Sequence, residues 1–190
     1  TRIKGFQPEK MVACTLVFEG SPSEVSQQQR DLYRIAARHG GVAAGSENGR
    51  RGYQLTFSIA YIRDFLMSYY IIAESFETSV SWSGALGLID NVKRRLIDEY
   101  KGRELPGKPY VTARVTQIYR TGVCIYFYFG FYYKGLPDPQ KIYLELEDAA
   151  RDEILKAGGS LSHHHGVGKL RRAYLPRIMS ETALQWKREL

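Results

Sequence analysis

Two stretches in the middle of the chain have patterns typical of β-strands. Residues 110–119 alternate between apolar and polar positions with a period of two, and residues 123–133 form an almost continuous apolar and aromatic run. Only Arg120, Thr121 and Gly122 separate the two stretches. The pattern therefore predicts a β-hairpin whose strands pair antiparallel across a tight turn.

Apolar positions spaced three or four residues apart predict helices on both sides of this hairpin. The first helix has a start signal, because Ser21 can cap it, Pro22 suits its first turn and Glu24 completes a capping box. Helices are expected over 22–39, 53–66, 83–100, 139–157 and 176–190. Other strands are expected over 10–19, 42–44 and 68–79, an extended segment after residue 159, and a polar turn over 45–52.

The helical periodicity also indicates which side chains face a core. In the helix over 83–100 these are Leu86, Ile89, Val92, Leu96 and Tyr100. In the first helix they are Val25, Leu32, Ile35 and Ala36, and in the helix over 139–157 they are Ile142, Leu146, Ala149, Ala150 and Ile154. Each helix should therefore pack through one face only.

The order of these elements predicts an α+β fold. Tight turns require antiparallel strand pairing, and amphipathic helices can cover one face of such a sheet. We expect a ferredoxin-like two-layer sandwich, an antiparallel sheet with helices on one face. The sequence contains no glycine-rich dinucleotide loop, Walker loop, GxSxG, HExxH or paired CxxC motif.

The net charge and the two cysteines exclude few classes of function. The net charge of +7 permits acidic partners such as phosphate esters, nucleic acids or anionic membranes. The basic residues form short clusters rather than one long stripe, which favours an anion pocket over a nucleic-acid groove. The two cysteines, Cys14 and Cys124, lie in apolar runs and are expected to be buried free thiols, with half-cystines as the alternative.

Residues 158–172 concentrate ionisable groups. His163, His164 and His165 are adjacent, two glycines follow that allow a close approach of the backbone, and three cations follow between 169 and 172. Imidazoles can transfer protons near neutral pH, and cations suit a phosphate or carboxylate. This segment is the strongest candidate for an active site.

The histidines could instead belong to a metal site, an expression tag or a solvated loop. Neighbouring side chains of an extended segment point to opposite faces, so at most two of them converge, and no Cys, Asp or Glu stands at ligand spacing nearby. We therefore expect no metal site. An expression tag is disfavoured because the run is internal and short. A solvated loop between helices stays an alternative.

The strand expected over 123–133 consists almost entirely of apolar and aromatic residues. Tyr126 and Tyr128 share one face, and Phe127 and Phe129 share the other, so one face carries hydroxyl groups. Strand tyrosines are usually amphipathic core residues with bonded hydroxyls. A phenol, whose pKa is about 10, acts as a base near neutral pH only where its surroundings favour the anion.

Several segments together resemble one family. The run Gly-Gly-Ser-Leu-Ser-His-His-His-Gly-Val-Gly-Lys-Leu-Arg over 158–171 closely resembles the histidine triplet of the alkyldihydroxyacetonephosphate synthases, flavoenzymes of ether-lipid synthesis. Residues 43–53, 60–64, 74–79 and 124–129 are similar to that family as well. The resemblance covers nearly the whole chain.

The resemblance implies a flavin-dependent exchange without net redox change. The fatty acid of acyl-dihydroxyacetone phosphate would be replaced by a long-chain alcohol, with FAD as the cofactor. It implies that Tyr126, His163, His164 and His165 are catalytic, and that Tyr126, His164 and His165 also face the flavin. It makes Arg63 the first candidate for the substrate's phosphate or carboxylate, and Lys169 and Arg171 weaker ones. Asp64 is too close in sequence to be the usual helical partner of Arg63, and Glu74 and Glu77 are expected to be structural.

The resemblance also implies an organisation and a setting. Residues 1–175 would form the substrate-binding or cap domain and 176–190 the start of a C-terminal helical segment. A domain that binds the flavin pyrophosphate is absent from this sequence, which suggests a piece of a longer protein. We further expect a homodimer, a peripheral membrane contact, no nucleic-acid partner, and a peroxisomal location if the source is eukaryotic.

Two other functions stay open as alternatives to the synthase. A flavin-dependent 2-hydroxyacid dehydrogenase would have Glu-His-Gly in the matching segment, where this chain has histidines and Ser162. An RRM-like RNA-binding module would stack bases on exposed aromatics. In this chain, however, Lys134 and Gly135 follow the aromatic strand and do not precede it.

Overall fold

The computed structural model describes residue 7 and residues 10–189. The chain divides into two compact units, one ending at Ile62 and the other beginning at Arg63. The candidate site residues all belong to the second unit. The predicted boundary at 175/176 is not tested by this division, and residues 1–6, 8, 9 and 190 of the predicted ranges lie outside the described part.

The first unit is built from helices. Helix α1 (Pro22–Arg38) begins with the predicted capping box, in which the Ser21 hydroxyl accepts from the Glu24 N–H at 3.4 Å and the Glu24 carboxylate accepts from the Ser21 N–H at 2.8 Å. The predicted buried stripe of α1 is wrong, because no residue of this helix is buried and Ile35 is 51% exposed. The described part of this unit contains no strand against which α1 could pack.

The elements around α1 also differ from the expectation. Residues 10–19 and 42–44 form no strand in the described chain, since no described strand pairs with them. The expected polar turn over 45–52 lies in helix α2 (Ser46–Leu55), which a 3₁₀ turn (Thr56–Ser58) joins to helix α3 (Ile59–Ser68). The glycines that predicted a turn are tolerated because this helix is exposed.

The second unit contains the predicted hairpin. Strands β2 (Tyr110–Ile118) and β3 (Gly122–Tyr132) pair antiparallel, and β1 (Ile71–Ser81) pairs with the other edge of β3, giving the order β1-β3-β2. A β-bulge at Thr116 shifts the register, so Val115 pairs with Ile125 and Gln117 with Cys124.

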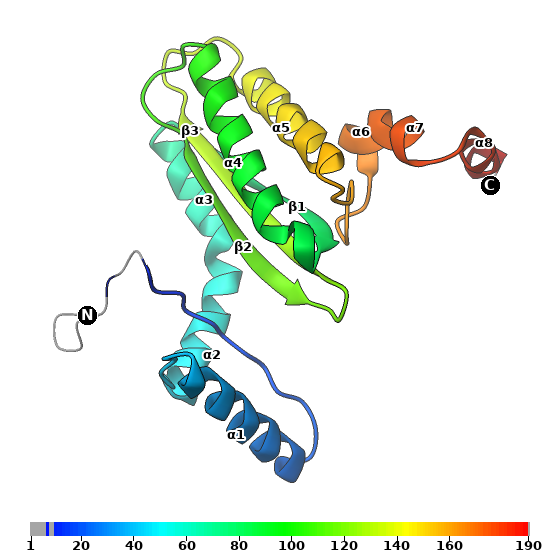
Figure 1. Cartoon of the computed structure of the whole chain (residues 1–190). Coiled ribbons are helices and arrows are strands. Elements are labelled where there is room, and N and C mark those ends of the chain that lie inside the picture. The colour runs from blue at the N-terminus through cyan, green and yellow to red at the C-terminus, as the bar shows by residue number, and fades with distance from the viewer. Residues whose placement is uncertain (1–6, 8–9, 190) are drawn as a thin grey trace. The chain divides into compact units, whose positions relative to one another are not determined.

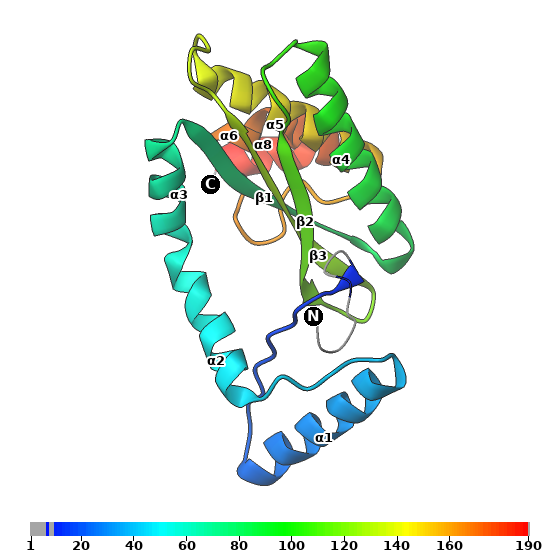
Figure 2. The same cartoon turned by 90° about the vertical axis from the view of Figure 1, so that its left-hand side faces the viewer.

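Two helices cover one face of this sheet (Figures 1 and 2). They are α4 (Ala85–Gly102), which a 3₁₀ turn (Trp82–Gly84) precedes, and α5 (Pro139–Lys156). Between the layers the rings of Phe76 and Phe127 stack at 5.4 Å, and Leu96 and Leu146 are fully buried. The α+β two-layer class with helices on one face is thus confirmed, although the described sheet has three strands and fewer elements than the expected duplicated order.

The predicted inward stripes hold for α5 and partly for α4. Leu146, Ala149, Ala150 and Ile154 are buried, with Ile142 partly so. On α4 the buried stripe is Ala85, Leu88, Val92, Leu96 and Tyr100, and the assignment of Leu86 was wrong because it is 78% exposed. Leu86 follows the buried Ala85 by one residue, so its side chain points about 100° away from Ala85 around the helix axis.

The opposite face of the sheet carries the polar and ionisable side chains. Residues paired directly across strands share a face, and Glu77, Tyr126 and Arg114 form one such row. Cys124 lies on the same face, two positions from Tyr126. As predicted, Glu74 falls on the face opposite to Glu77.

After α5 the chain forms a loop and then several short helices. The expected extended segment after residue 159 is a loop up to α6 (Gly168–Arg171), and a 3₁₀ turn leads into α7 (Leu175–Ile178). The single helix expected over 176–190 is interrupted at Met179, whose backbone is extended, and resumes as α8 (Glu181–Glu189). Among the described helices none is long and apolar enough to cross a membrane.

Candidate active site

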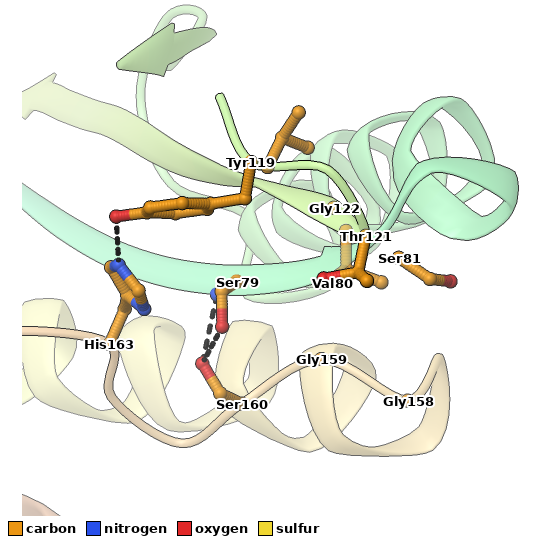
Figure 3. A pocket seen from close by; sticks show the side chains of 11 residues that line it. Ser79, Val80, Ser81, Tyr119, Thr121, Gly122, Gly158, Gly159, Ser160 and His163 are labelled. Carbon is orange, nitrogen blue, oxygen red and sulfur yellow. Dashed lines mark hydrogen bonds between the residues drawn. The ribbon is translucent and has the colours of Figure 1, made fainter. Parts of the chain in front are cut away.

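The loop after α5 is fastened to strand β1 at Ser160. The Ser160 N–H donates to the Ser79 carbonyl at 2.8 Å, and the Ser160 hydroxyl accepts from the Ser79 N–H at 2.8 Å (Figure 3). The Thr78 hydroxyl donates to the Ser160 carbonyl at 2.7 Å. A Cβ at Gly159 would lie 2.8 Å from the side chains of Leu88, Ile154 and Thr78, so only glycine fits here.

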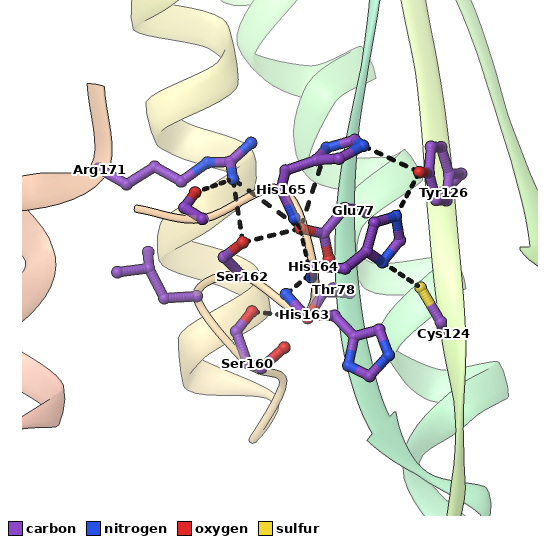
Figure 4. Close-up of polar contacts among 12 residues, drawn as sticks. Glu77, Thr78, Cys124, Tyr126, Ser160, Ser162, His163, His164, His165 and Arg171 are labelled. Atoms are coloured by element: carbon purple, nitrogen blue, oxygen red, sulfur yellow. Dashed lines mark hydrogen bonds and ion pairs between the residues drawn. The ribbon is translucent and has the colours of Figure 1, made fainter. Parts of the chain in front are cut away.

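A buried carboxylate organises the histidine triplet. Glu77 accepts the backbone N–H of His163 at 2.7 Å, of His165 at 3.1 Å and of His164 at 3.4 Å, and the Ser162 hydroxyl at 2.8 Å (Figure 4). Burial opposes the ionisation of Glu77, but these four hydrogen bonds outweigh it and lower its pKa. An anion at Glu77 therefore holds the loop.

Arg171 turns inward toward the same anion. Its Nη1 donates to the Gly166 carbonyl at 2.7 Å and to the Ser162 hydroxyl at 3.1 Å, and lies 3.8 Å from Glu77 Oε1. The residue is 9% exposed. These contacts give Arg171 a role in holding the loop, and they occupy the face that a substrate anion would need.

Tyr126 brings two of the histidines together. Its hydroxyl lies 2.5 Å from Nε2 of His164 and 2.9 Å from Nε2 of His165 (Figure 4). At most two histidines were expected to converge, and two share this hydroxyl. Burial, with the nearby Cys124, Glu77 and Tyr128, raises the pKa of Tyr126. Its hydroxyl is therefore protonated at neutral pH.

His165 is suited to accept a proton. Burial lowers its pKa more than Glu77, 3.9 Å from His165 Nδ1, raises it. A neutral imidazole whose Nε2 faces the Tyr126 hydroxyl can take that proton when the phenol oxygen takes one from a substrate. The arrangement is a short proton relay on the open face of the sheet.

His163 faces a different group of residues. Its Nε2 lies 2.9 Å from the Tyr119 hydroxyl. Cys124 Sγ lies 4.0 Å from Nδ1 of His164, and one ligand atom each of Cys124, His163 and His164 lie within 4.8 Å of one another. Spacing along the sequence could not show this cluster, because Cys124 comes from β3, roughly 40 residues before the histidines.

His163 also borders a hollow of about 540 Å³. Figure 3 shows the loop over 158–160, the end of β1 and the hairpin turn around it. Its lining mixes apolar and polar groups, with hydroxyls from Ser79, Ser160 and Tyr119 among them. The hollow therefore lies beside the Tyr119–His163 pair, and Tyr126 is not among its lining residues.

The remaining predicted substrate-binding residues lie apart from this cluster. Arg63 is 48% exposed and pairs with Asp64 at 3.3 Å and with Glu74 at 3.6 Å, so the expectation that Asp64 is not its partner was wrong. Glu74 is three residues from Glu77, about 10 Å along the strand, and on the other face. Lys169 is exposed on α6.

Sequence reasoning missed Glu77 and Arg114. Glu77 was expected to be structural, and only its pairing with backbone groups 86 residues away reveals its role. Arg114 is the strand partner of Tyr126 and lies 5.5 Å from the ring of Tyr128. Burial raises the pKa of Tyr126, and the charge of Arg114 opposes that rise in part. The cation beside the phenol is therefore Arg114, where Arg63 was expected.

Comparison with known proteins gives consistent matches. The family model described as FAD linked oxidases, C-terminal domain, matches residues 2–190. The chain is 46% identical over 175 residues to the alkyldihydroxyacetonephosphate synthase of Caenorhabditis elegans, covering 92% of this chain and 29% of that protein. It is 30% identical over 166 residues to the alkyldihydroxyacetonephosphate synthase of Dictyostelium discoideum, covering 87% of this chain and 27% of that protein.

A solved structure of alkyldihydroxyacetonephosphate synthase is similar too. The TM-score is 0.64 at 25% identity, over 84% of this chain and 29% of that one. The chain therefore spans less than a third of the length of the relatives it matches. The resemblance read from the histidine triplet is confirmed over most of the chain.

Proposed function

Because this chain belongs to the FAD-linked oxidase family, as its C-terminal domain, we propose that it is the substrate-positioning part of an alkyldihydroxyacetonephosphate synthase. The whole protein would exchange the fatty acid of acyl-dihydroxyacetone phosphate for a long-chain alcohol. Family membership favours a flavoenzyme over the RNA-binding module considered above.

The observation that carries the proposal is the Tyr126 hydroxyl, held between Nε2 of His164 and Nε2 of His165. In the exchange, the bond from C1 of the substrate to the acyl oxygen breaks and a bond from C1 to the alcohol oxygen forms. The fatty acid leaves as a carboxylate, and the alcohol loses its proton. Two proton movements are needed, one at C1 and one at the alcohol, and this relay can receive and return them.

The open face of the sheet fits a flavin ring. The helices α4 and α5 both lie on the other face of the sheet (Figure 2), and Tyr126 and Tyr128 are only partly buried. These planar side chains and the imidazoles of His164 and His165 match a flat, polar-edged ligand. Bound FAD would supply a centre that exchanges electrons with the substrate carbon without net redox change.

The residues of the chain would then have separate tasks. Glu77 and Arg171 hold the loop, and Tyr126, His164 and His165 move protons at the reacting carbon. Arg63 and Lys169, which are exposed, are the candidates for gripping the phosphate. His163, bonded to Tyr119, would orient the loop at the edge of the hollow.

The test uses the purified protein in its full natural length, incubated with palmitoyl-dihydroxyacetone phosphate and hexadecanol. We expect the flavin absorbance to bleach with the acyl substrate and alkyl-dihydroxyacetone phosphate to form when the alcohol is added. Flavin that stays oxidised with this substrate but is reduced by a 2-hydroxy acid would establish the dehydrogenase instead. A protein without bound flavin would contradict both.

We also propose the setting expected from the family resemblance. It comprises a homodimer, a peripheral membrane contact and, in a eukaryotic source, a peroxisomal location. Exposed apolar side chains on α3, among them Phe65 and Met67, support a contact surface. Sedimentation of the full-length protein, flotation with liposomes and imaging of a tagged protein would each test one of these proposals.

A further inference from the structure

We propose that Cys124, His163 and His164 form a binding site for a divalent transition-metal ion, best suited to Zn²⁺. The site would lie between strand β3 and the histidine loop, next to the proton relay. Thiolate and imidazole together are the ligands that Zn²⁺ prefers. Three protein ligands would leave one position of a tetrahedral site open to water or to a substrate oxygen.

The ligand atoms are close to the required geometry. They lie within 4.8 Å of one another, and Cys124 Sγ is 4.0 Å from His164 Nδ1. Zinc bonds of about 2.0–2.3 Å in a tetrahedron place ligand atoms roughly 3.3–3.8 Å apart. Side-chain rotations that move the ligand atoms by about 1 Å would therefore close the site.

Both imidazoles already have a partner on the nitrogen away from the proposed metal. The Tyr126 hydroxyl contacts Nε2 of His164, and the Tyr119 hydroxyl contacts Nε2 of His163. Each ring would thus offer Nδ1 to a metal. Metal-binding histidines characteristically donate their second N–H to such an oxygen, which fixes the tautomer and the ring orientation.

The surroundings suit a metal in two further ways. The backbone N–H groups of His163 and His164 are bound to the Glu77 carboxylate, so the loop that carries both ligands is held in place, and a negative charge lies nearby. Burial raises the pKa of the Cys124 thiol, and the Thr116 hydroxyl beside it at the β-bulge opposes that rise only in part. No described group pairs with the buried Thr116 hydroxyl oxygen. A metal-bound thiolate would give it a partner.

Occupation of this site would take His164 out of the relay and leave His165 as its one acceptor. A metal on Nδ1 of His164 fixes a proton on Nε2, and that nitrogen could then no longer accept a proton from Tyr126. This consequence rests on the proposed function, whereas the metal site itself does not. Zinc would then act as a reversible inhibitor of the synthase.

The first experiment measures binding without reference to turnover. The full-length protein, freed of metal by a chelator, is titrated with Co²⁺, and absorbance is followed at wavelengths beyond the flavin bands. We expect tetrahedral cobalt bands with one Co²⁺ per chain, which Zn²⁺ displaces. Failure to develop these bands at saturating Co²⁺ would overturn the proposal.

Variants locate the metal. Cys124→Ser should weaken binding by roughly a hundredfold or more, and Tyr119→Phe, which removes only the partner of His163, by about tenfold. The matched control is Cys14→Ser, which removes the exposed second cysteine and should bind Co²⁺ like the parent. Loss of the bands in Cys14→Ser, or their survival in Cys124→Ser, would overturn the assignment.

A second variant distinguishes the loss of a metal ligand from the loss of the fold. Because Cys124 is fully buried, His163→Gln is measured in parallel, with circular dichroism and flavin content confirming the native state. Unchanged Co²⁺ affinity in folded His163→Gln would contradict the proposed ligand set. A reduction comparable to that of Cys124→Ser would support it.

A separate measurement of ether formation tests whether the metal inhibits the enzyme. Ether formation by the parent should fall on addition of Zn²⁺ and return with EDTA, and Cys124→Ser should resist this inhibition. Inhibition that persists in Cys124→Ser would place the inhibitory ion elsewhere and overturn the link to the relay. If no ether forms even without metal, the proposed function fails, while the cobalt spectrum still decides the metal site.

Discussion

The Ser162 hydroxyl donates a 2.8 Å hydrogen bond to the carboxylate of Glu77, which lies 85 residues earlier on strand β1. The backbone N–H groups of all three histidines are bound to the same carboxylate. One buried anion therefore determines where the backbone of the histidine loop lies. The consequences can be tested residue by residue.

Replacing Glu77 should destabilise the fold and disable the loop together. Glu77→Ala leaves four donors and the Arg171 guanidinium without their anion, and we expect a loss of about 3 kcal/mol or more in the free energy of unfolding. Glu77→Gln keeps one acceptor oxygen and should lose less. Urea unfolding measures both. The control is Glu74→Gln, whose side chain is 52% exposed on the other face of the same strand, and it should change the free energy of unfolding by less than about 1 kcal/mol.

Tyr126→Phe should separate catalysis from folding. The ring that packs on the sheet stays, whereas the hydroxyl between His164 and His165 is lost. We expect ether formation to fall by about 10²–10⁴-fold with flavin binding retained. Tyr128→Phe, whose ring centroid is 6.3 Å away on the same face, should keep most of the activity. Equal losses in both variants would show that the hydroxyl of Tyr126 has no special part.

Gly159→Ala should detach the loop from the core. The added methyl group would lie 2.8 Å from Leu88, Ile154 and Thr78, so the loop must shift, at an expected cost of about 1–3 kcal/mol. Gly87→Ala on α4 is the matched control, because no atom lies within 4 Å of its Cβ and it is exposed. It should stabilise the protein by up to about 1 kcal/mol. Thermal unfolding of both variants should therefore shift in opposite directions.

Acid should remove a small stabilising contribution at Glu99. The side-chain hydrogen bond from Arg103 lowers the pKa of Glu99 against the effect of burial, with Arg95 adding to it. Because the pKa is lower in the folded state, this stabilisation is present above the unfolded value near 4.3 and is lost as pH falls through the folded pKa. We expect up to about 1 kcal/mol. Glu99→Gln should reduce the dependence of unfolding free energy on pH between about 5 and 3, and an unchanged dependence would contradict this.

The sequence predicted the second unit better than the first. An alternating stretch and an aromatic run on either side of a tight turn predicted β2 and β3, and helical spacing predicted α4 and α5. The run over 10–19 alternates equally well but forms no strand, since alternation gives a strand a face and cannot supply a neighbour to pair with. Arg114 was missed because only the strand register places it beside Tyr126.

The loop over 160–165 also has a consequence for how the protein folds. Its anchoring bonds join residues more than 80 positions apart, so they can form only after β1, β3 and α5 have assembled. The amide protons of His163 and His165 should therefore gain protection from hydrogen exchange late in refolding, after those of the sheet. The catalytic segment would act as a reporter of completed assembly, and a chain that has not finished folding would lack an ordered site.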